Sequence, residues 1–394
     1  MTVEYDPNSE EVQRDPYPTY KRLRDESPVH WVESYRGWAL TRFEDQWNLT
    51  QENERLTTRE GTTPMYLVVG AIPALPNLNH MDPPSHRLLR SALIPFFLPR
   101  RVGTVEPRIR EVVRACIDAF VEKGEACAVR DVGQVVASRL ACMAIGFPDG
   151  DSDYIVDVVR RFVARDEAIA GMPPAAVAAF EEMQTYLSSV AKARRAYRGA
   201  PENPIDVLLQ ARVEGAALDD EIVGQHLILL LVGATETFPK SFASAVLRLW
   251  QHPEQRRALA EAPRAIPTAL RECLRYDMPT QFAMRRVKVD FELHGRRLRR
   301  GDNLMFVWPA GNRDEREFPE PDRFDVRRNP LRFLSFGNGI HRCLGAHFAQ
   351  MEGKVLLEEL LAAAPDYEVD LAGAQPGRSE LFRGFARLPI RVGS

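Results

Sequence analysis

Hydrophobic residues along most of the chain recur at the three- and four-residue spacing of amphipathic helices, most regularly from about Val105 to Gln251. Alternating, strand-like patterns are short and few. They occupy Val29–Val32 with Trp38–Thr41, Arg285–Glu292 and Asn303–Trp308. The pattern predicts a mainly α fold with a minor β-sheet.

The longest helical pattern starts after Asp219 and ends at His252-Pro253, about thirty residues later. Its centre is apolar except for Glu236 and Thr237, a carboxylate and a hydroxyl where a buried helix should be dry. Pro239 has no N–H to bond the carbonyl four residues earlier, so we expect the helix to distort beside this pair. A plainer interpretation is that the pair only satisfies loose backbone groups at a proline kink.

One cysteine, Cys343, lies in the glycine-rich segment FGNGIHRCLG, directly before another amphipathic pattern. The positive end of a helix favours a thiolate there. Gly337, Gly339 and Gly345 remove side chains that would keep a flat ligand off the backbone. A cysteine in such a loop is more often a small buried hydrophobic residue, but a thiolate beside a flat surface suggests haem iron.

The segment Phe336–Gly345 resembles the haem-binding signature of the cytochrome P-450 superfamily, and every fixed position of that signature matches. The resemblance implies the cytochrome P-450 fold, with heme b (iron-protoporphyrin IX) between the long central helix and the helix after the cysteine loop. It implies that Cys343 binds the iron and that Glu236 and Thr237 deliver protons during oxygen activation. Phe238 departs from a common threonine, and either narrows the pocket or packs against a neighbouring helix.

Cations suited to the haem carboxylates are found in the segment MDPPSHRLLRSAL and near the cysteine. His86 and Arg90 are four apart, so they point the same way from one helix. By the resemblance they bind a haem propionate together with His341 and either Arg285 or Arg286, of which we favour Arg285. Taken singly, each of these residues is more often a surface charge than a ligand.

A second feature of the resemblance is structural. Glu272 and Arg275 are three apart in the helical run TALRECLRY and can pair. The resemblance implies a buried ion triad in which Arg323 is the third member and which fixes the segment leading into the haem loop. The alternative is a solvated salt bridge.

Apolar residues in the irregular stretch Thr62–Pro84 suggest a covered surface. In the family this stretch roofs the pocket, with the strand Thr280–Met284 and a turn at Leu381-Phe382. Such a lining implies a hydrophobic, medium-sized substrate, oriented by polar groups such as Gln281 or Asn79. These residues are equally compatible with an ordinary core.

Two helical runs, Ser152–Ala170 and Ala175–Tyr197, meet at Gly171-Met172-Pro173-Pro174 and resemble the family's lid, although a buried helical pair is equally compatible. A basic face suits an acidic ferredoxin, which a ferredoxin reductase would supply with electrons. The arginines of that face are Arg100, Arg101, Arg108, Arg110, Arg114 and Arg342.

Composition bounds these expectations. The 394 residues are 45% hydrophobic and lack a linker, a repeat or a low-complexity tract, which predicts a single domain over 1–394. A formal charge of −3 argues against nucleic-acid binding. The polar N-terminus resembles neither a signal peptide nor a membrane anchor, so we expect a cytoplasmic protein of the soluble bacterial class with no membrane partner.

The sequence therefore predicts a haem-thiolate monooxygenase that uses O2 to hydroxylate or epoxidise a hydrophobic substrate, in secondary metabolism or catabolism. A peroxide-driven or oxygen-independent haem-thiolate enzyme is the first alternative, and the acid–alcohol pair argues against it because peroxide already carries its protons. A non-catalytic haem sensor or electron carrier is the second. An apolar roof and a lid disfavour that alternative, since neither role needs an organic pocket.

Overall fold

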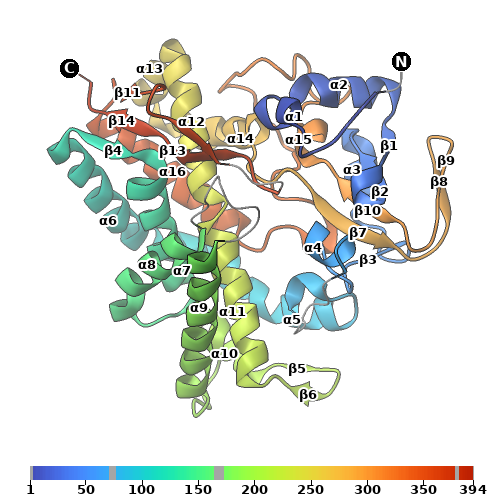
Figure 1. The fold of residues 1–394 in the computed structure, drawn as a ribbon. Helices are drawn as coiled ribbons and strands as arrows, with labels where there is room; N and C mark the ends of the chain where they lie inside the picture. The colour runs from blue at the N-terminus through green and yellow to red at the C-terminus, as the bar shows by residue number, and fades with distance from the viewer. Residues whose placement is uncertain (1–2, 71–76, 164–172, 378–380, 394) are drawn as a thin grey trace. The chain divides into compact units, whose positions relative to one another are not determined.

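The computed structural model describes residues 3–70, 77–163, 173–377 and 381–393 (Figure 1). The chain divides into two compact units, each assembled from segments distant in sequence. The first comprises 1–87, 271–343 and 379–383, and the second comprises 88–270, 344–378 and 384–394. The single domain over 1–394 stays a prediction, and each unit is described by itself.

A five-stranded sheet forms the centre of the first unit, in the order β1-β2-β10-β7-β3. Its strands are β1 (Val29–Val32), β2 (Gly37–Leu40), β3 (Leu56–Thr57), β7 (Ala283–Val287) and β10 (Asn303–Phe306). Only the β2–β10 pair is parallel. The predicted strand Arg285–Glu292 is instead two, because β8 (Phe291–Leu293) pairs with β9 (Arg296–Leu298) in a separate hairpin that turns at His294-Gly295.

The two faces of this sheet belong to two apolar clusters, as the alternation of side chains along a strand requires. Leu304 and Phe306 of β10 lie in one cluster with Leu40, whereas Met305 lies in the other with Met284. Short helices surround these clusters. They are α1 (Glu10–Arg14), α2 (Tyr17–Glu26), α3 (Phe43–Leu49), α4 (Pro64–Leu67) and α15 (Trp308–Asn312).

The second unit is mostly helical. Its helices are α6 (Pro99–Lys123), α7 (Gln134–Ile145), α8 (Ser152–Val163), α9 (Pro174–Arg194), α10 (Pro204–Gln210), α11 (Asp220–Thr235), α12 (Phe238–Gln251), α13 (Pro253–Glu261) and α16 (Ala346–Ala363). α11 packs on α7 and α9, and α6 packs on α16. In a three-stranded sheet, β14 (Pro389–Arg391) lies between β11 (Glu368–Val369) and β4 (Glu125–Cys127). Two further pairs are β12 (Gln375–Gly377) with β13 (Gly384–Arg387), and β5 (Arg212–Val213) with β6 (Ala216–Ala217). α5 (Ser85–Leu93) and α14 (Ile266–Tyr276) contribute residues to both units.

The predicted long helix is present and broken where the proline pattern indicated. Asp219 caps it by accepting the backbone N–H of Ile222 at 2.7 Å. α11 then ends at Thr235, and α12 begins at Phe238. By length and composition alone Asp220–Gln251 could cross a membrane, and half of its most apolar window is buried inside the protein.

The predicted lid corresponds to α8 and α9. The turn between them lies largely outside the described residues, which resume at Pro173. Pro174 is the first residue of α9, a position where the missing N–H of proline costs no helical hydrogen bond.

Candidate functional site

The cysteine loop exposes its thiol. Cys343 is exposed, and its backbone N–H donates to the carbonyl of Phe336 at 2.8 Å, which folds the loop back on itself. The loop was expected to place the cysteine at a helix N-terminus. In the structure α16 begins three residues later, at Ala346.

The loop glycines serve two purposes. A Cβ added at Gly337 or Gly345 would meet no atom within 4 Å, so open space adjoins the backbone at both positions. Gly339 differs, because a Cβ there would collide with the carbonyl oxygen of Thr50. The expectation that all three glycines make room for a ligand is therefore wrong for Gly339, which makes room for the chain itself.

Two of the predicted cations lie side by side in the first unit. The rings of His86 and His341 have centroids 4.3 Å apart and are tilted by 46°. His86 is buried, whereas His341 is half-buried and has its Nε2 3.4 Å from the Thr58 hydroxyl oxygen. The structure thus brings together residues that are 255 positions apart in the sequence.

Asp82 is a member of this region that sequence reasoning missed. Its carboxylate accepts the Thr57 hydroxyl at 2.5 Å and the Thr58 backbone N–H at 3.1 Å. The aspartate thereby ties the start of α5 to strand β3 and holds Thr58 beside His341. Its position directly before the double proline was the only signal in the sequence.

Arg285 is a buried cation whose side chain bonds to the main chain. Its side chain is 8% exposed, and it donates to the carbonyl of Met284 at 3.1 Å. Burial lowers the pKa of Arg285 to about 10, although the charge of Asp82 acts in the opposite direction. Among the described residues no carboxylate forms an ion pair with it. A buried guanidinium of this kind suits an anionic ligand.

Arg286 is committed elsewhere. It pairs with Glu60 at 3.0 Å and donates to the side-chain oxygen of Asn303 at 2.7 Å. It also donates to the carbonyl of Gly301 at 2.9 Å. Of the two arginines left open by the sequence, the geometry favours Arg285 as the ligand-binding one.

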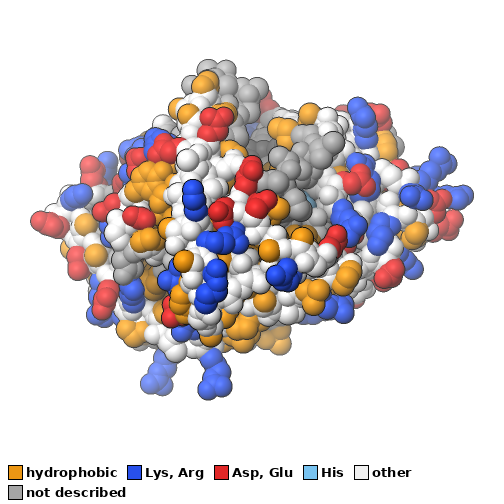
Figure 2. Space-filling view, turned by 90° about the horizontal axis from the view of Figure 1, so that it is seen from below, with side chains coloured by type: hydrophobic (Ala, Val, Ile, Leu, Met, Phe, Trp, Pro, Cys, Tyr) orange, Lys and Arg blue, Asp and Glu red, His pale blue; other side chains and the backbone are white. Residues whose placement is uncertain are grey.

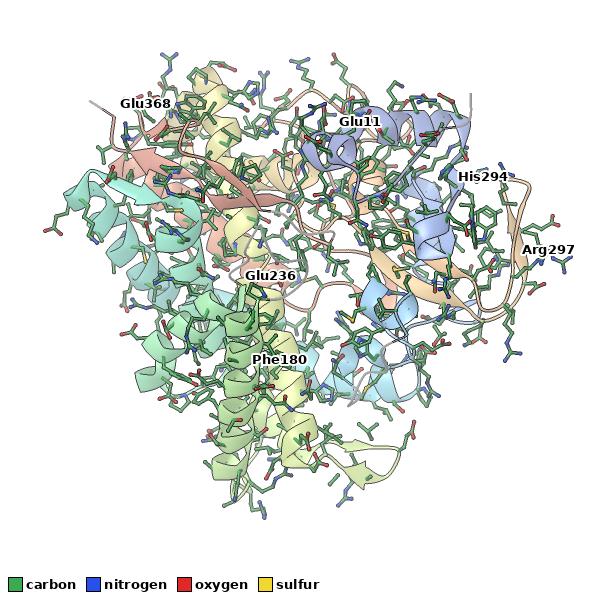
Figure 3. The ribbon with its side chains drawn as sticks, viewed as in Figure 1. Glu11, Phe180, Glu236, His294, Arg297 and Glu368 are labelled. Carbon is green, nitrogen blue, oxygen red and sulfur yellow. The ribbon has the colours of Figure 1, made fainter. Side chains whose placement is uncertain are left out.

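The second unit holds the acid–alcohol pair at the junction of α11 and α12, where Figure 3 labels Glu236. Glu236 and Thr237 are both half-buried. The Thr237 hydroxyl donates to the carbonyl of Gly233 at 3.2 Å, and a Cβ at Gly233 would meet nothing within 4 Å. Phe238 is only 6% exposed, which favours the packing role for it.

Comparisons with known proteins assign the family. The cytochrome P450 family model matches residues 175–387. A putative cytochrome P450 123 of Mycobacterium tuberculosis is 33% identical over 399 residues, covering 98% of this chain and 96% of that protein. The chain belongs to the cytochrome P450 family. The vitamin D(3) 25-hydroxylase of Pseudonocardia autotrophica is 31% identical, covering 100% of this chain and 97% of the relative.

Solved structures agree. The cytochrome P450 PksS of the Bacillus subtilis 168 bacillaene polyketide synthase has a TM-score of 0.85 and 26% identity, covering 99% of this chain and 100% of the other. The cytochrome P450 fold, mainly α with small sheets, is confirmed. The protein is a cytochrome P450 monooxygenase, and its cofactor is heme b.

The residues of this cytochrome P450 fit that cofactor. An exposed thiol is available for iron, and the backbone is open at Gly337 and Gly345. Arg285 is a buried cation that lacks a carboxylate partner among the described residues, which suits a haem propionate. Arg90 is half-buried in α5, four residues after His86.

The ion triad exists with a different third member. Arg275 donates to both carboxylate oxygens of Glu272, at 2.7 and 2.8 Å, and Arg328 donates to Glu272 Oε1 at 3.2 Å. Arg323 was predicted in that place, and the prediction is wrong. Arg323 pairs at the surface with Glu320, because the turn after it carries Arg328 back toward Glu272.

The predicted substrate region is only partly as expected. Leu67 and Val68 pack into the core of the first unit, whereas Met65 and Val69 are exposed. Residues 71–76 of the same stretch lie outside the described residues. Thr280 pairs with Phe382, so the structure does bring that strand and the C-terminal turn together.

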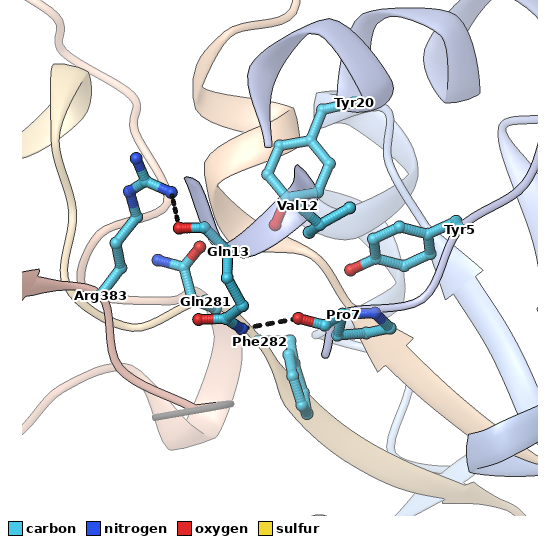
Figure 4. Close-up of a pocket in the computed structure, with 8 residues that line it drawn as sticks. All are labelled: Tyr5, Pro7, Val12, Gln13, Tyr20, Gln281, Phe282 and Arg383. Carbon is cyan, nitrogen blue, oxygen red and sulfur yellow. Dashed lines mark hydrogen bonds between the residues drawn. The ribbon is translucent and has the colours of Figure 1, made fainter. Parts of the chain in front are cut away.

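Gln281 uses its side-chain amide to bond the main chain, so that amide is not directed at a substrate. Its amide donates to the carbonyls of Met278 and Pro279, at 3.4 and 3.2 Å. It lines a pocket of about 10 Å³, room for a single water, against Tyr5 and Arg383 (Figure 4). Asn79 is exposed in the short 3-10 turn Leu78–His80.

The predicted basic face is partly neutralised. Arg110 of α6 pairs with Glu106 and with Glu358 and Glu359 of α16, at 2.6 to 2.9 Å, and Arg114 pairs with Glu359 at 3.0 Å. These arginines join two helices of the second unit. On the face that Figure 2 shows, acidic and basic side chains are interspersed.

Proposed function

We propose that this cytochrome P450 inserts one atom of O2 into a C–H or C=C bond of a hydrophobic small-to-medium organic substrate, while the second atom leaves as water. The observation that carries the proposal is the break between α11 and α12, which holds Glu236 and Thr237 half-buried together. An enzyme that uses peroxide, which already carries its protons, has no need of such a pair. A haem sensor or an electron carrier has no need of an acid–alcohol pair either.

Cys343 is proposed to bind the haem iron through its thiolate, and haem would supply the oxygen-activating redox chemistry when bound. Arg285 and His86 are proposed to bind a propionate, together with Arg90 and His341. The guanidinium charges of Arg285 and Arg90 complement the carboxylate, and the buried position of Arg285 strengthens that attraction. Asp82 and Thr58 support this group by holding the chain beside His341.

Proton delivery is assigned to the acid–alcohol pair. The Thr237 hydroxyl donates to the Gly233 carbonyl, and its oxygen keeps lone pairs that can accept a proton. To pass its own proton on, the hydroxyl would turn away from that carbonyl as the new proton arrives. The Glu236 carboxyl, adjacent in sequence, is proposed to replace the proton on the Thr237 hydroxyl with one taken from solvent. The two side chains therefore act in series, and each has a distinct effect when it is removed.

The proposal extends to the substrate class, the electron donor and the location. A relative is named as a vitamin D(3) 25-hydroxylase, which is consistent with a hydrophobic organic substrate. Electrons are proposed to come from a ferredoxin and its reductase. Arg100 and Arg101, exposed at the start of α6, and the exposed Arg342 are the candidates to meet the acidic ferredoxin. A cytoplasmic location is proposed.

The test uses the purified holoprotein. A compound collection is screened for the substrate-induced shift of the haem absorption band, and the best compound is turned over with ferredoxin, reductase and 18O2. One 18O atom per product supports the proposal. Product that carries no 18O, product formed only with added peroxide, or reductant oxidation that never depends on a compound from the screen would each overturn it.

A further inference from the structure

Lys240 has an unusual position for a lysine in the first turn of a helix. It lies in α12, one turn after Glu236, and its Nζ donates to the main-chain carbonyl of Glu236 at 2.9 Å. A lysine side chain in the first turn of an exposed helix would extend into water. Here it is half-buried and folds back across the break between α11 and α12.

A glycine provides the surface on which this side chain rests. A Cβ at Gly384 of β13 would lie 2.8 Å from Cβ, 3.1 Å from Cγ and 3.4 Å from Cδ of Lys240. Gly384 also has a φ of +148°, which side-chain-bearing residues rarely adopt. The aliphatic part of Lys240 is thus fixed against the β13 backbone, and its ammonium is directed at Glu236.

The bond from Lys240 to the Glu236 carbonyl lies at the C-terminal end of α11, where a positive charge is stabilising. Glu236 is the C-cap of α11, where helix carbonyls lack partners and the negative end of the helix dipole attracts positive charge. Pro239 cannot donate a backbone N–H into this gap. A charge-assisted hydrogen bond from Lys240 stabilises the carbonyl there and limits rotation of the Glu236 backbone.

Further hydrogen bonds order the same turn. The Ser241 hydroxyl donates to the carbonyl of Thr237 at 3.3 Å, while the Thr237 hydroxyl donates to the carbonyl of Gly233. The accepting carbonyls belong to Glu236 and Thr237 themselves and to Gly233, one turn earlier. Of these donors among the described residues, only the one on Lys240 carries a charge.

We propose that Lys240 is a positioning residue for proton delivery: its aliphatic chain packs against Gly384, and its ammonium holds the backbone of Glu236 in the break so that the carboxyl stays in series with Thr237. The inference rests on the proposed function and adds to it a residue outside the acid–alcohol pair. A simple helix cap would contribute stability alone, whereas a positioning residue also controls how electrons divide between product and peroxide.

The test compares holoprotein variants. Lys240→Met keeps the aliphatic contact with Gly384 and removes the charge and the donor, whereas Lys240→Arg keeps a cation that can donate. Gly384→Ala adds a Cβ that displaces the aliphatic chain of Lys240. Lys123→Met, at the exposed end of α6, is the matched control. Two quantities are measured: amide hydrogen exchange of residues 233–241, and the ratio of product to hydrogen peroxide with the compound selected on the wild type.

Lys240→Met and Gly384→Ala should speed exchange in 233–241 and lower the product-to-peroxide ratio by about tenfold, the factor that corresponds to one charge-assisted hydrogen bond. Lys240→Arg and Lys123→Met should stay within about twofold of the wild type in both measurements, because neither removes a charge-assisted bond at the break. Faster exchange with an unchanged ratio would reduce Lys240 to a structural cap and overturn the inference, as would no change in either quantity. A wild type that incorporates no 18O would instead disprove the proposed function, whatever the variants do.

Discussion

Glu272 and Arg275 form a fully buried, two-bonded ion pair within a single turn of α14: Arg275 Nε and Nη2 reach the two carboxylate oxygens at 2.7 and 2.8 Å, and neither side chain is exposed. Burial lowers the pKa of Arg275, and the Glu272 carboxylate acts against that shift. Arg275 also donates to the carbonyls of Asn312 and Pro321. The pair therefore joins α14 to the segment that leads toward the cysteine loop.

Removing the shared carboxylate should be severe. Glu272→Ala leaves Arg275 buried without its anion, and losing one partner of a buried pair costs about 3–5 kcal/mol of unfolding free energy. We expect little soluble holoprotein, measured as haem absorbance per protein in the soluble fraction. Arg328→Ala should lower the melting temperature measurably. Arg323→Ala is the control and should change stability by no more than about 0.5 kcal/mol, since its pair is exposed. Equal effects of the two arginine variants would contradict the assignment of Arg328.

Cys343→His should retain haem, because imidazole is also an iron ligand, but should lose the strongly red-shifted absorption of the reduced carbon monoxide complex. That band depends on donation from a thiolate. Activity should disappear with it. Spectra of the reduced protein with and without carbon monoxide decide the matter, and Cys116→Ser serves as the control because that residue lies elsewhere, in α6. A variant with both the band and turnover would exclude Cys343 as the ligand.

Arg285→Gln should lower the haem content and speed haem transfer to an acceptor such as apomyoglobin by roughly tenfold or more, because the side chain loses its charge toward a propionate. Arg286→Gln is a matched control in the neighbouring position of the same strand, and it should affect stability through the loss of Glu60 and Asn303 rather than haem transfer. Haem transfer would be followed by absorbance. If Arg286→Gln speeds haem transfer more than Arg285→Gln does, Arg286 is the arginine that binds the propionate.

Thr237→Ala removes a hydroxyl without adding bulk, so haem loading and the substrate-induced band shift should barely change. Reductant use should continue while product falls and hydrogen peroxide rises, because protons no longer arrive through Thr237 Oγ1. Glu236→Gln keeps the shape and should instead slow the whole cycle. Product, peroxide and reductant are measured in parallel. Full coupling in Thr237→Ala would mean that protons arrive by another route.

Glu352 of α16 gives a pH dependence to stability. Its side chain is 6% exposed, its Oε1 has no hydrogen-bond partner among the described residues, and burial raises its pKa well above the usual glutamate value. The folded state therefore binds a proton that the unfolded state releases, so the unfolding free energy falls as pH rises above the ordinary glutamate range. Glu352→Gln should remove this slope. The melting temperatures of the wild type and the variant should differ little at pH 5, and the variant should melt at an increasingly higher temperature than the wild type toward pH 8. If the two plots of melting temperature against pH run parallel, Glu352 ionises normally.

Local features of the chain were predictable, and long-range partners were not. The cysteine loop, the break beside Pro239 and the strand Val29–Val32 depend on neighbouring residues, and the structure has all three. The contact between Gly339 and Thr50 joins distant segments, so the glycine could not be assigned from its own loop.

The choice between Arg323 and Arg328 failed for a related reason. Both arginines lie in one arginine-rich stretch, and only the turn at Asp325, whose N–H donates to Glu272 at 3.2 Å, determines which of them reaches the carboxylate. Arg110 was similarly misread, because its partners on α16 lie almost 250 positions away. Helix packing, not local pattern, sets such pairs.

The bond between Asp82 and Thr58 has a consequence for how this enzyme could change its substrate over time. It closes the stretch between them into a loop of 24 positions whose two ends are held together by one carboxylate. The residues on which we expect haem to rest adjoin those ends: His86 follows Asp82, and His341 contacts Thr58. Substitutions at the exposed positions of this stretch, such as Met65 and Val69, leave that carboxylate and its two bonds in place, so a new specificity can be sought there without disturbing the cofactor's anchorage.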